Sequence, residues 1–414
     1  MPGIALGFRP FDEQVAFFRR KLNVPTAGWT DLWQEHHAHG FMVAGVARAD
    51  LLNDLRGAVD RAIAGGIGFD QFQRDFSAIA DRAGWDPRGG KAWRAKVIYD
   101  TNVRQSYNAG RWQQLNDPDM ALTRPFLRYR HSDRSRFPRP LHQSWDGRIL
   151  RRDDPWWRTH APQNGWGCKC YVEAVSAREM RRLGKEGADE APDDGTYQWA
   201  DKRTGEVHTI PKGIDPGFAY NVGEASRALP AQRRFGELVM RMPPTWRARA
   251  LSDATFRAQQ WFDDFAPRVR GLAGDAIAPA GTTYGVGYLS PAAAAAVATE
   301  TPTALLAIAD HDVAHALRAT KAARGAAVTV DQLQMLPRWL ARPDAVLRDR
   351  RDGALIYVHR LSDTQFVKIV VRPGFTDRRA GDLRGRTANW IRTVGVVDRG
   401  NLRDASYELI EGRL

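Results

Sequence analysis

Two groups of residues in this 414-residue chain have the types and spacing that chemistry requires. The first closes an aromatic, arginine-rich segment, where Cys168 and Cys170 follow three histidines, His131, His142 and His160. Imidazole and thiolate are preferred ligands of zinc, and four of them in tetrahedral geometry would stabilise a segment with few aliphatic side chains. The candidate zinc ligands are Cys168, Cys170, His142 and His160. The alternative is that the thiols are small buried side chains and the histidines pack or form hydrogen bonds.

The second group lies near residue 311, where a helix would place His311 and His315 on one face, with Arg318 beside them. A histidine pair beside a cation is what metal-independent RNA cleavage uses. One group takes the proton of the 2′-hydroxyl, another protonates the leaving oxygen, and the cation stabilises the phosphorane. Lys368, a polar residue in an apolar run, and Thr393 could complete such a site. The alternative is a histidine pair that only packs or forms hydrogen bonds.

The elements that must position these residues differ between the two ends of the chain. Near the N-terminus, apolar residues recur at three- and four-residue spacing, which predicts helices at 12–22, 31–46, 49–64, 69–83 and 91–115. Near the C-terminus, helical patterns at 291–298, 303–319 and 330–340 precede strand-like runs at 345–347, 355–359, 366–371 and 390–397.

These patterns predict an α+β chain with three parts. A mostly helical domain with a layer of aromatic and arginine-rich loops and a hairpin occupies residues 1–180. A polar linker or bridging region follows at 181–269. A small α+β domain, with helices followed by an antiparallel strand meander, ends the chain at 270–414.

The charge of the chain is concentrated in one segment. Lys and Arg number 61 against 48 Asp and Glu, and residues 124–158 alone hold ten arginines and four acidic residues. Such an excess fits contact with phosphate, although the base composition of a GC-rich genome also produces arginine. The candidate phosphate or nucleic-acid contacts here are Arg128, Arg130 and Arg139. The candidate protein-interaction surface comprises Trp145, Trp156, Trp157 and Trp166, because tryptophan is a favoured interface anchor.

Several protein classes do not fit the sequence. No run approaches the roughly 18 apolar residues of a membrane span, and the N-terminus lacks a basic region followed by an apolar one. Two cysteines, one residue apart, do not make a disulfide scaffold, which favours a reducing site of synthesis. We therefore expect no membrane association and no cofactor other than the candidate zinc.

A long ordered set of motifs carries a family resemblance over about residues 45–180. In chain order the motifs are Tyr99-Asp100-Thr101-Asn102, Tyr107-Asn108-Ala109-Gly110-Arg111, Arg124-Pro125, Tyr129, Arg139-Pro140-Leu141-His142, Asp146-Gly147, Asp153-Asp154-Pro155-Trp156-Trp157 and Pro162-Gln163-Asn164-Gly165-Trp166-Gly167-Cys168-Lys169-Cys170. This set resembles the phage Mu F-like head morphogenesis (minor head protein) family, with Lys169 where the family commonly has arginine. The resemblance implies a low-copy structural protein of a phage head, associated with the portal and needed for head assembly or DNA packaging, without enzyme activity.

A second resemblance covers roughly residues 280–400. Its motifs are Val330-Asp331-Gln332-Leu333, Leu336-Pro337, Pro343-Asp344-Ala345-Val346-Leu347, Gly353-Ala354-Leu355-Ile356-Tyr357, Lys368-Ile369-Val370-Val371 and Arg392-Thr393-Val394-Gly395. They resemble phage-associated barnase/EndoU/colicin/RelE-like nuclease domains. That resemblance implies a catalytic set of His311, His315, Lys368 and Thr393, with Arg318 and Arg392 as phosphate partners. A tyrosine or serine present in some such sites has no counterpart here.

The sequence therefore predicts a minor structural protein of a phage or prophage head, made in the bacterial host cytoplasm and located in the virion head. It would act in capsid morphogenesis and DNA packaging through the portal protein, the major capsid protein and packaged DNA. The alternative is a toxin-type ribonuclease acting on RNA, carried by a virion protein. Convergence of His311, His315 and Lys368 would favour the enzyme, and a Lys368 that points to solvent would weaken it.

Overall fold

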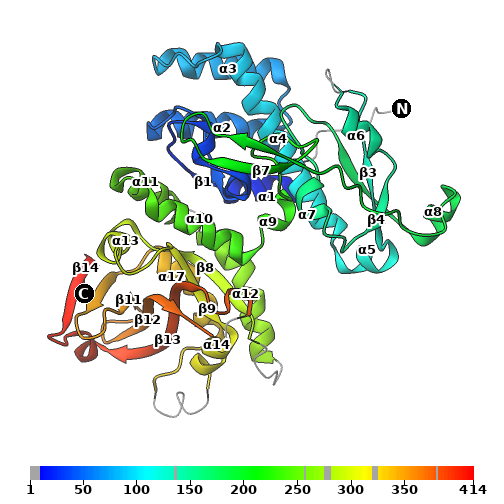
Figure 1. The fold of residues 1–414 in the computed structure, drawn as a ribbon. Coiled ribbons are helices and arrows are strands. Elements are labelled where there is room, and N and C mark those ends of the chain that lie inside the picture. The colour runs from blue at the N-terminus through cyan, green and yellow to red at the C-terminus, as the bar shows by residue number, and fades with distance from the viewer. Residues whose placement is uncertain (1–9, 135–137, 256–257, 275–280, 319–324, 379–380) are drawn as a thin grey trace, which may run out of the picture. The chain divides into compact units, whose positions relative to one another are not determined.

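The computed structural model describes residues 10–134, 138–255, 258–274, 281–318, 325–378 and 381–414. The chain forms two compact units, Met1–Arg227 and Ala228–Leu414, referred to below as the N-terminal and C-terminal units (Figure 1). Together they confirm the predicted α+β class, with helices dominating the beginning of the chain and a strand meander near its end. None of the described helices is long and apolar enough to cross a lipid bilayer.

Helices build the first half of the N-terminal unit. They are α1 (Asp12–Arg20), α2 (Ala49–Gly65), α3 (Phe69–Arg82) and α4 (Lys91–Leu115), which match four of the five predicted ranges. Gly66 ends α2 in the left-handed conformation at a φ of 65°, as the Gly65-Gly66 pair suggests. Leu52, Phe72, Phe76 and Ile98 lie in the shared core of these helices.

The remaining prediction, a helix at 31–46, is wrong. This region contains the 3-10 helices η1 (Trp29–Asp31) and η2 (Gln34–Ala38), and then β2 (Gly40–Phe41), which pairs in parallel with β1 (Leu22–Asn23). The backbone of residues 39–41 bonds to residues 22–24, so it is used in strand pairing and cannot continue a helix.

A small sheet with short helices forms the second half of the N-terminal unit. The strands β3 (Phe126–Arg130), β4 (Ile149–Arg151) and β5 (Tyr171–Val175) are antiparallel in the order β4-β3-β5. The helices around them are α5 (Pro118–Thr123), α6 (Pro140–Ser144), α7 (Trp157–His160) and α8 (Ala177–Arg182). Tyr129, Trp145, Trp156 and Trp157 fill the core here, so large aromatic rings supply the apolar area that aliphatic residues supply elsewhere.

The predicted linker at 181–269 is divided between the two units. Its first part holds the hairpin β6 (Thr196–Ala200) and β7 (Val207–Pro211) and the short helix α9 (Val222–Ala225). Ile210, Ile214 and Phe218 are buried in the same core as the tryptophans, and this packing makes the segment part of the N-terminal unit. The remainder begins the C-terminal unit with α10 (Leu229–Arg241), α11 (Pro244–Thr255) and α12 (Ala258–Gly274).

A seven-stranded sheet organises the C-terminal unit, in the order β14-β10-β11-β12-β13-β9-β8. Its strands are β8 (Thr283–Tyr288), β9 (Leu305–Ala309), β10 (Ala345–Asp349), β11 (Leu355–Arg360), β12 (Gln365–Thr376), β13 (Thr387–Asp398) and β14 (Tyr407–Gly412). Four of them, β10 to β13, form the predicted antiparallel meander. Its other described elements are α13 (Pro291–Ala296), α14 (Asp310–Ala316), α16 (Val330–Gln334), α17 (Leu336–Ala341), η3 (Gly381–Leu383) and η4 (Arg399–Leu402).

The predicted helix 303–319 begins instead with a strand. All five residues of β9 are buried, and β9 pairs with β13 on one side and β8 on the other. A short apolar run of this kind fits a buried strand as well as a buried helix, so the pattern alone could not decide. The helix starts only at Asp310, and residue 319 lies outside the described residues.

Candidate functional site

Two cysteines and a histidine meet in the core of the N-terminal unit. Cys168 and Cys170 lie in the segment between α7 and β5, and His142 lies on α6. All three are buried. The Nδ1 atom of His142 is 3.7 Å from the Sγ of Cys168 and 3.6 Å from the Sγ of Cys170. A hydrogen bond from Cys170 lowers the pKa of the Cys168 thiol against the opposing effect of burial.

The ring of His142 is held in one orientation by its neighbours. Its Nε2 lies 2.7 Å from the carbonyl oxygen of Gly213, and the ring stacks on Trp145 at 5.0 Å between centroids. A carbonyl can only accept, so Nε2 carries the proton, and a neutral imidazole then presents an unprotonated Nδ1 to the sulfur atoms. Gly213 has a φ of 84°, and a Cβ there would lie 2.5 Å from the Trp145 ring, so this close approach requires glycine.

The histidine beside the cysteines is His131, whereas the sequence pointed to His160. The Nδ1 of His131 is 3.6 Å from the Sγ of Cys170, and its side chain is only 6% exposed. His160 instead stacks on Trp156 at 4.3 Å, and its Nδ1 lies 3.2 Å from the carbonyl oxygen of that residue. Burial lowers the pKa of His160 to about 4. We call His131, His142, Cys168 and Cys170 the thiol–imidazole cluster.

Strand register explains why His131 was missed. Arg130 pairs with Tyr171 at the end of the antiparallel β3–β5 ladder, so the next residues, His131 and Cys170, face each other. The strand at 126–130 is predictable from sequence, but its partner and register are not. The pairing of β3 with β5 is therefore the information needed to select His131 as a candidate ligand.

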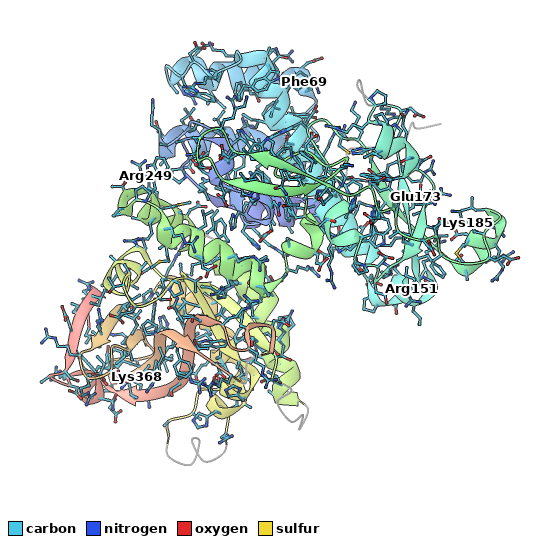
Figure 2. The ribbon with its side chains drawn as sticks, viewed as in Figure 1. Phe69, Arg151, Glu173, Lys185, Arg249 and Lys368 are labelled. Atoms are coloured by element: carbon cyan, nitrogen blue, oxygen red, sulfur yellow. The ribbon has the colours of Figure 1, made fainter. Side chains whose placement is uncertain are left out.

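The three arginines proposed as phosphate contacts are ion-paired within the N-terminal unit. Arg128 lies 2.6 Å from Glu173, which is labelled on β5 in Figure 2. Arg130 lies 3.0 Å from Asp146. Arg139 lies 2.6 Å from Asp215. Glu173 and Asp215 follow the 124–158 segment in sequence, so the local excess of arginine is partly balanced by acidic residues outside that window.

Three of the four tryptophans proposed as an interaction surface form the core instead. Trp145 is 0%, Trp157 1% and Trp156 7% exposed. The indole nitrogen of Trp145 donates to Asp194 at 2.8 Å, which satisfies its one polar atom. Trp166 is 41% exposed and is the one member of the predicted set that can contact a partner.

In the C-terminal unit, four predicted residues line one open pocket of about 510 Å³. They are His311, His315, Arg318 and Arg392, and Asp312, Arg372 and Phe375 complete the lining. Arg392 reaches the pocket because of a β-bulge. Val370 faces Thr393 and Val371 faces Ile391, so Arg392 is the extra residue on β13. Bulges redirect side chains in this way, and the sequence carries no clear signal for one.

Two buried carboxylates accompany this pocket, and neither was predicted. The Nη1 of Arg392 is 2.6 Å from the Oδ2 of Asp377 and 3.3 Å from the Oδ2 of Asp312. The Nε2 of His311 is 3.2 Å from the same oxygen of Asp312 and 4.0 Å from that of Asp377. We call these four residues the carboxylate cluster. Its histidine and carboxylates have the spacing of a metal-binding group, but Arg392 already supplies a positive charge to both carboxylates.

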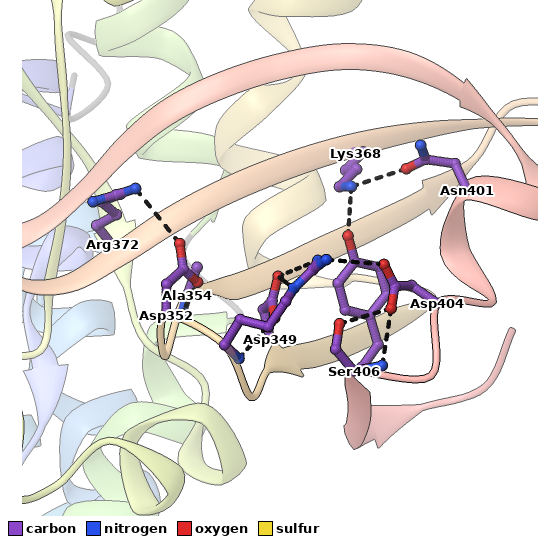
Figure 3. Close-up of polar contacts among 10 residues, drawn as sticks. Asp349, Asp352, Ala354, Lys368, Arg372, Asn401, Asp404 and Ser406 are labelled. Atoms are coloured by element: carbon purple, nitrogen blue, oxygen red, sulfur yellow. Dashed lines mark hydrogen bonds and ion pairs between the residues drawn. The ribbon is translucent and has the colours of Figure 1, made fainter.

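The predicted catalytic set is not brought together. Lys368 on β12 donates to Asn401 on η4 at 2.9 Å and to Tyr407 on β14 at 2.8 Å (Figure 3). Thr393 faces Val370, two residues along from Lys368, so alternation places Thr393 and Lys368 on the same face of the sheet. The histidines line the pocket with Arg392 instead, and the ribonuclease activity stays a prediction.

The comparisons with known proteins concern the segment that holds the thiol–imidazole cluster. Residues 53–173 match the family model described as Phage Mu protein F like protein, which agrees with the resemblance expected at about 45–180. The chain carries a Mu F-like domain. All four cluster residues lie within the matched span of this domain.

Two curated relatives extend the likeness beyond the Mu F-like domain. Protein F of Escherichia phage Mu, which is assigned to capsid assembly, is 29% identical over 98% of this chain and 96% of its own length. The Mu-like prophage FluMu F protein of Haemophilus influenzae is 28% identical over 83% of this chain and 88% of its own length. No solved structure matches the chain. The nuclease resemblance of the region after the Mu F-like domain stays a prediction.

Proposed function

We propose that this protein is a minor structural protein of a phage or prophage head and acts in head morphogenesis. The observation that carries the proposal is the end-to-end likeness to protein F of phage Mu, which spans 98% of this chain and 96% of that protein. A likeness confined to residues 53–173 would concern one domain. Because it includes the C-terminal unit, we assign the role to the whole chain.

We further propose that the protein acts through protein–protein contacts, with the portal protein as its first partner and the major capsid protein as its second. Trp166, Trp29, Trp33 and Trp199 form a tryptophan cluster on the N-terminal unit. Trp29 lies 6.0 Å from Trp166 and 5.6 Å from Trp199, and Trp33 stacks on Trp199 at 5.4 Å. Rigid, part-exposed aromatic rings of this kind are favoured anchors in protein interfaces.

Contact with packaged DNA has less support from the same unit. Sequence-independent DNA binding depends on cationic side chains that can replace the counterions of phosphate. Arg128, Arg130 and Arg139 each lie within 3.0 Å of a carboxylate oxygen. A DNA contact through these arginines would have to break those pairs, so we assign them a structural role and place DNA after the protein partners.

The role is tested by a nonsense allele of the gene in the phage or inducible prophage that carries it. We expect the yield of DNA-filled, infectious heads to fall by at least about a hundredfold, and a plasmid copy of the wild-type gene to restore it. Heads are counted by electron microscopy and infectious particles by plaque assay. A normal yield of filled heads without the protein would contradict the proposal.

Two variants in the same complementation assay separate the proposed role from its alternatives. A chain with His311→Ala and His315→Ala should restore head formation, because the pocket histidines are not needed for assembly. Trp166→Ala should reduce crosslinks to the portal protein in purified heads, whereas Trp93→Ala, which alters another exposed tryptophan, should not. Failure of the histidine variant, or portal crosslinks that Trp166→Ala leaves unchanged, would count against this assignment.

A further inference from the structure

The distances among His142, Cys168 and Cys170 fit those between ligands on one metal ion, and His131 is tied to this group by one distance, from its Nδ1 to the Sγ of Cys170. With zinc–sulfur bonds of about 2.3 Å and zinc–nitrogen bonds of about 2.0–2.1 Å, a tetrahedral site places sulfur and nitrogen roughly 3.6 Å apart. The three sulfur–nitrogen distances are 3.7 Å, 3.6 Å and 3.6 Å. The ligand atoms of His142, Cys168 and Cys170 also lie within 4.8 Å of one another.

We propose that the Mu F-like domain binds a structural zinc ion through His142, Cys168 and Cys170, with His131 as the fourth ligand. Two sulfur and two nitrogen ligands in tetrahedral arrangement suit zinc better than magnesium or calcium, which prefer oxygen.

His142 is preorganised to bind the metal. Because Nε2 of His142 donates to the carbonyl of Gly213 at 2.7 Å, the metal-binding nitrogen is Nδ1, and it faces both sulfur atoms. A ligating histidine nearly always donates its other ring N–H to such an acceptor, which fixes its tautomer and direction. Stacking on Trp145 holds the ring plane as well.

The fourth ligand comes from the end of β3. His131 faces Cys170 across the β3–β5 register, and its side chain is 6% exposed. Its Nε2 is buried and has no hydrogen-bond partner in the part of the chain that the structure describes. A metal bound through Nδ1, the nitrogen that faces Cys170, leaves Nε2 to carry the proton of the ring, and a carboxylate oxygen of Asp133 lies 3.9 Å from it.

The surroundings indicate a structural ion. All four ligands come from the protein, so no coordination position is left open for water or substrate. The ion would connect β3, α6 and the segment before β5, whose shared core contains the large rings of Tyr129, Trp145 and Trp156. It would thereby fix the loop layer that carries Trp166.

The test is metal analysis of the full-length chain, purified without added chelator and again after incubation with zinc and desalting. We expect about one zinc per chain in the wild type and less than about a tenth of that in Cys168→Ser/Cys170→Ser. The control Asp312→Asn/Asp377→Asn changes the other metal-capable group and should keep its zinc. A folded wild-type chain without stoichiometric zinc after zinc incubation overturns the proposal.

A second measurement on the wild type does not depend on the folding of a variant. Both thiols should react slowly with a thiol reagent, and a zinc chelator should increase their rate at least about tenfold. His131→Ala keeps three ligands and should weaken zinc binding at least about tenfold, whereas His160→Gln should not. Thiols that react at the same rate with and without chelator, or a disulfide between them, contradict the site. A head-assembly defect in the complementation assay has no bearing on this result.

Discussion

The thiol–imidazole cluster combines two thiols with two imidazoles, whereas the carboxylate cluster combines two carboxylates with one imidazole and one guanidinium, so the two differ in charge balance. In the carboxylate cluster the guanidinium of Arg392 lies 2.6 Å and 3.3 Å from the two carboxylates. In the thiol–imidazole cluster the group that faces both sulfur atoms is the Nδ1 of His142. The carboxylate cluster therefore contains its own cation, Arg392, and the thiol–imidazole cluster is arranged to bind a cation.

This difference shows how similar residue types in the same chain come to have different roles. A carboxylate pair that already has an arginine gains little from a metal ion, because the ion would have to displace a charge-assisted hydrogen bond. Two thiols and an oriented imidazole have no such competitor among themselves. Ligand atoms spaced as in a metal site are thus weaker evidence for a metal than the absence of a cationic side chain between them.

The largest effect should come from the core that supports the thiol–imidazole cluster. Trp145 is fully buried and stacks on His142, so Trp145→Ala should lower the free energy of unfolding of the N-terminal unit by about 3–5 kcal/mol. It should also weaken zinc binding. Chemical denaturation followed by circular dichroism measures the loss, and Trp93→Ala, at a position 55% exposed, serves as the control. An equal loss in the free energy of unfolding of both units would show that the stability of the two clusters does not depend on separate cores.

A smaller effect is expected from Arg392→Met, which removes the cation of the carboxylate cluster. Asp377 and Asp312 are 2% and 8% exposed, and the loss of their arginine should destabilise the C-terminal unit by about 3 kcal/mol. The vacated position should then accept a divalent ion, so Mn²⁺ should raise the melting temperature of the variant and not that of the wild type.

Arg372→Met is the matched control for that experiment. Arg372 lines the same pocket, is 53% exposed and lies 3.5 Å from Asp352 (Figure 3). We expect its loss to cost less than about 1 kcal/mol and to create no response to Mn²⁺. If Mn²⁺ stabilises the wild type as strongly as Arg392→Met, the charge argument that separates the two clusters fails.

The smallest effect concerns pH and the N-terminal unit alone. Burial lowers the pKa of Lys21 to about 7, with a further contribution from nearby Arg56. Between pH 7 and 9.5 the unfolded chain holds a proton on this lysine that the folded chain has released, so stability should rise with pH across that window. Lys21→Met should remove about 2–3 kcal/mol of this rise and raise stability at pH 7.

Lys96→Met provides the comparison, because Lys96 is 52% exposed and pairs with Asp100. The free energy of unfolding of Lys96→Met, measured by urea denaturation at several pH values, should change with pH as that of the wild type does. A rise with pH that survives unchanged in Lys21→Met would show that Lys21 is charged when folded.

The sequence predicted elements where one periodicity extends over many residues, and failed where short segments depend on distant partners. Helices α2 and α3 have clear amphipathic patterns, α4 continues over 25 residues, and the meander has repeated apolar runs. Residues 31–46 and β9 were misread, because strand pairing with residues 22–24, β8 and β13 decides their conformation. The hairpin β6–β7 falls in the predicted linker because its two strands are only five residues each, and its packing against the tryptophan core through Ile210 depends on the fold.

The candidate sites follow the same rule. Cys168, Cys170 and His142 could be found from residue type, but the choice of His131 over His160 depends on the register of β3 and β5. Asp377 was not predictable, since it lies 65 positions from Asp312 and is brought to it by the fold. The arginine excess at 124–158 suggests phosphate contacts, but acidic partners such as Glu173 and Asp215 lie later in the chain and pair with Arg128 and Arg139.

The most direct test of the contrast between the clusters is the absorption spectrum of the full-length chain loaded with cobalt in place of zinc. Cobalt bound by two thiolates in a tetrahedral site has intense visible bands and a thiolate-to-metal charge-transfer band in the near ultraviolet, whereas cobalt bound by oxygen ligands gives only weak colour. We predict the thiolate spectrum, at about one cobalt per chain, for the wild type and Asp312→Asn/Asp377→Asn, and its loss in Cys168→Ser/Cys170→Ser. A weak spectrum that disappears in the aspartate variant and persists in the cysteine variant would contradict the account.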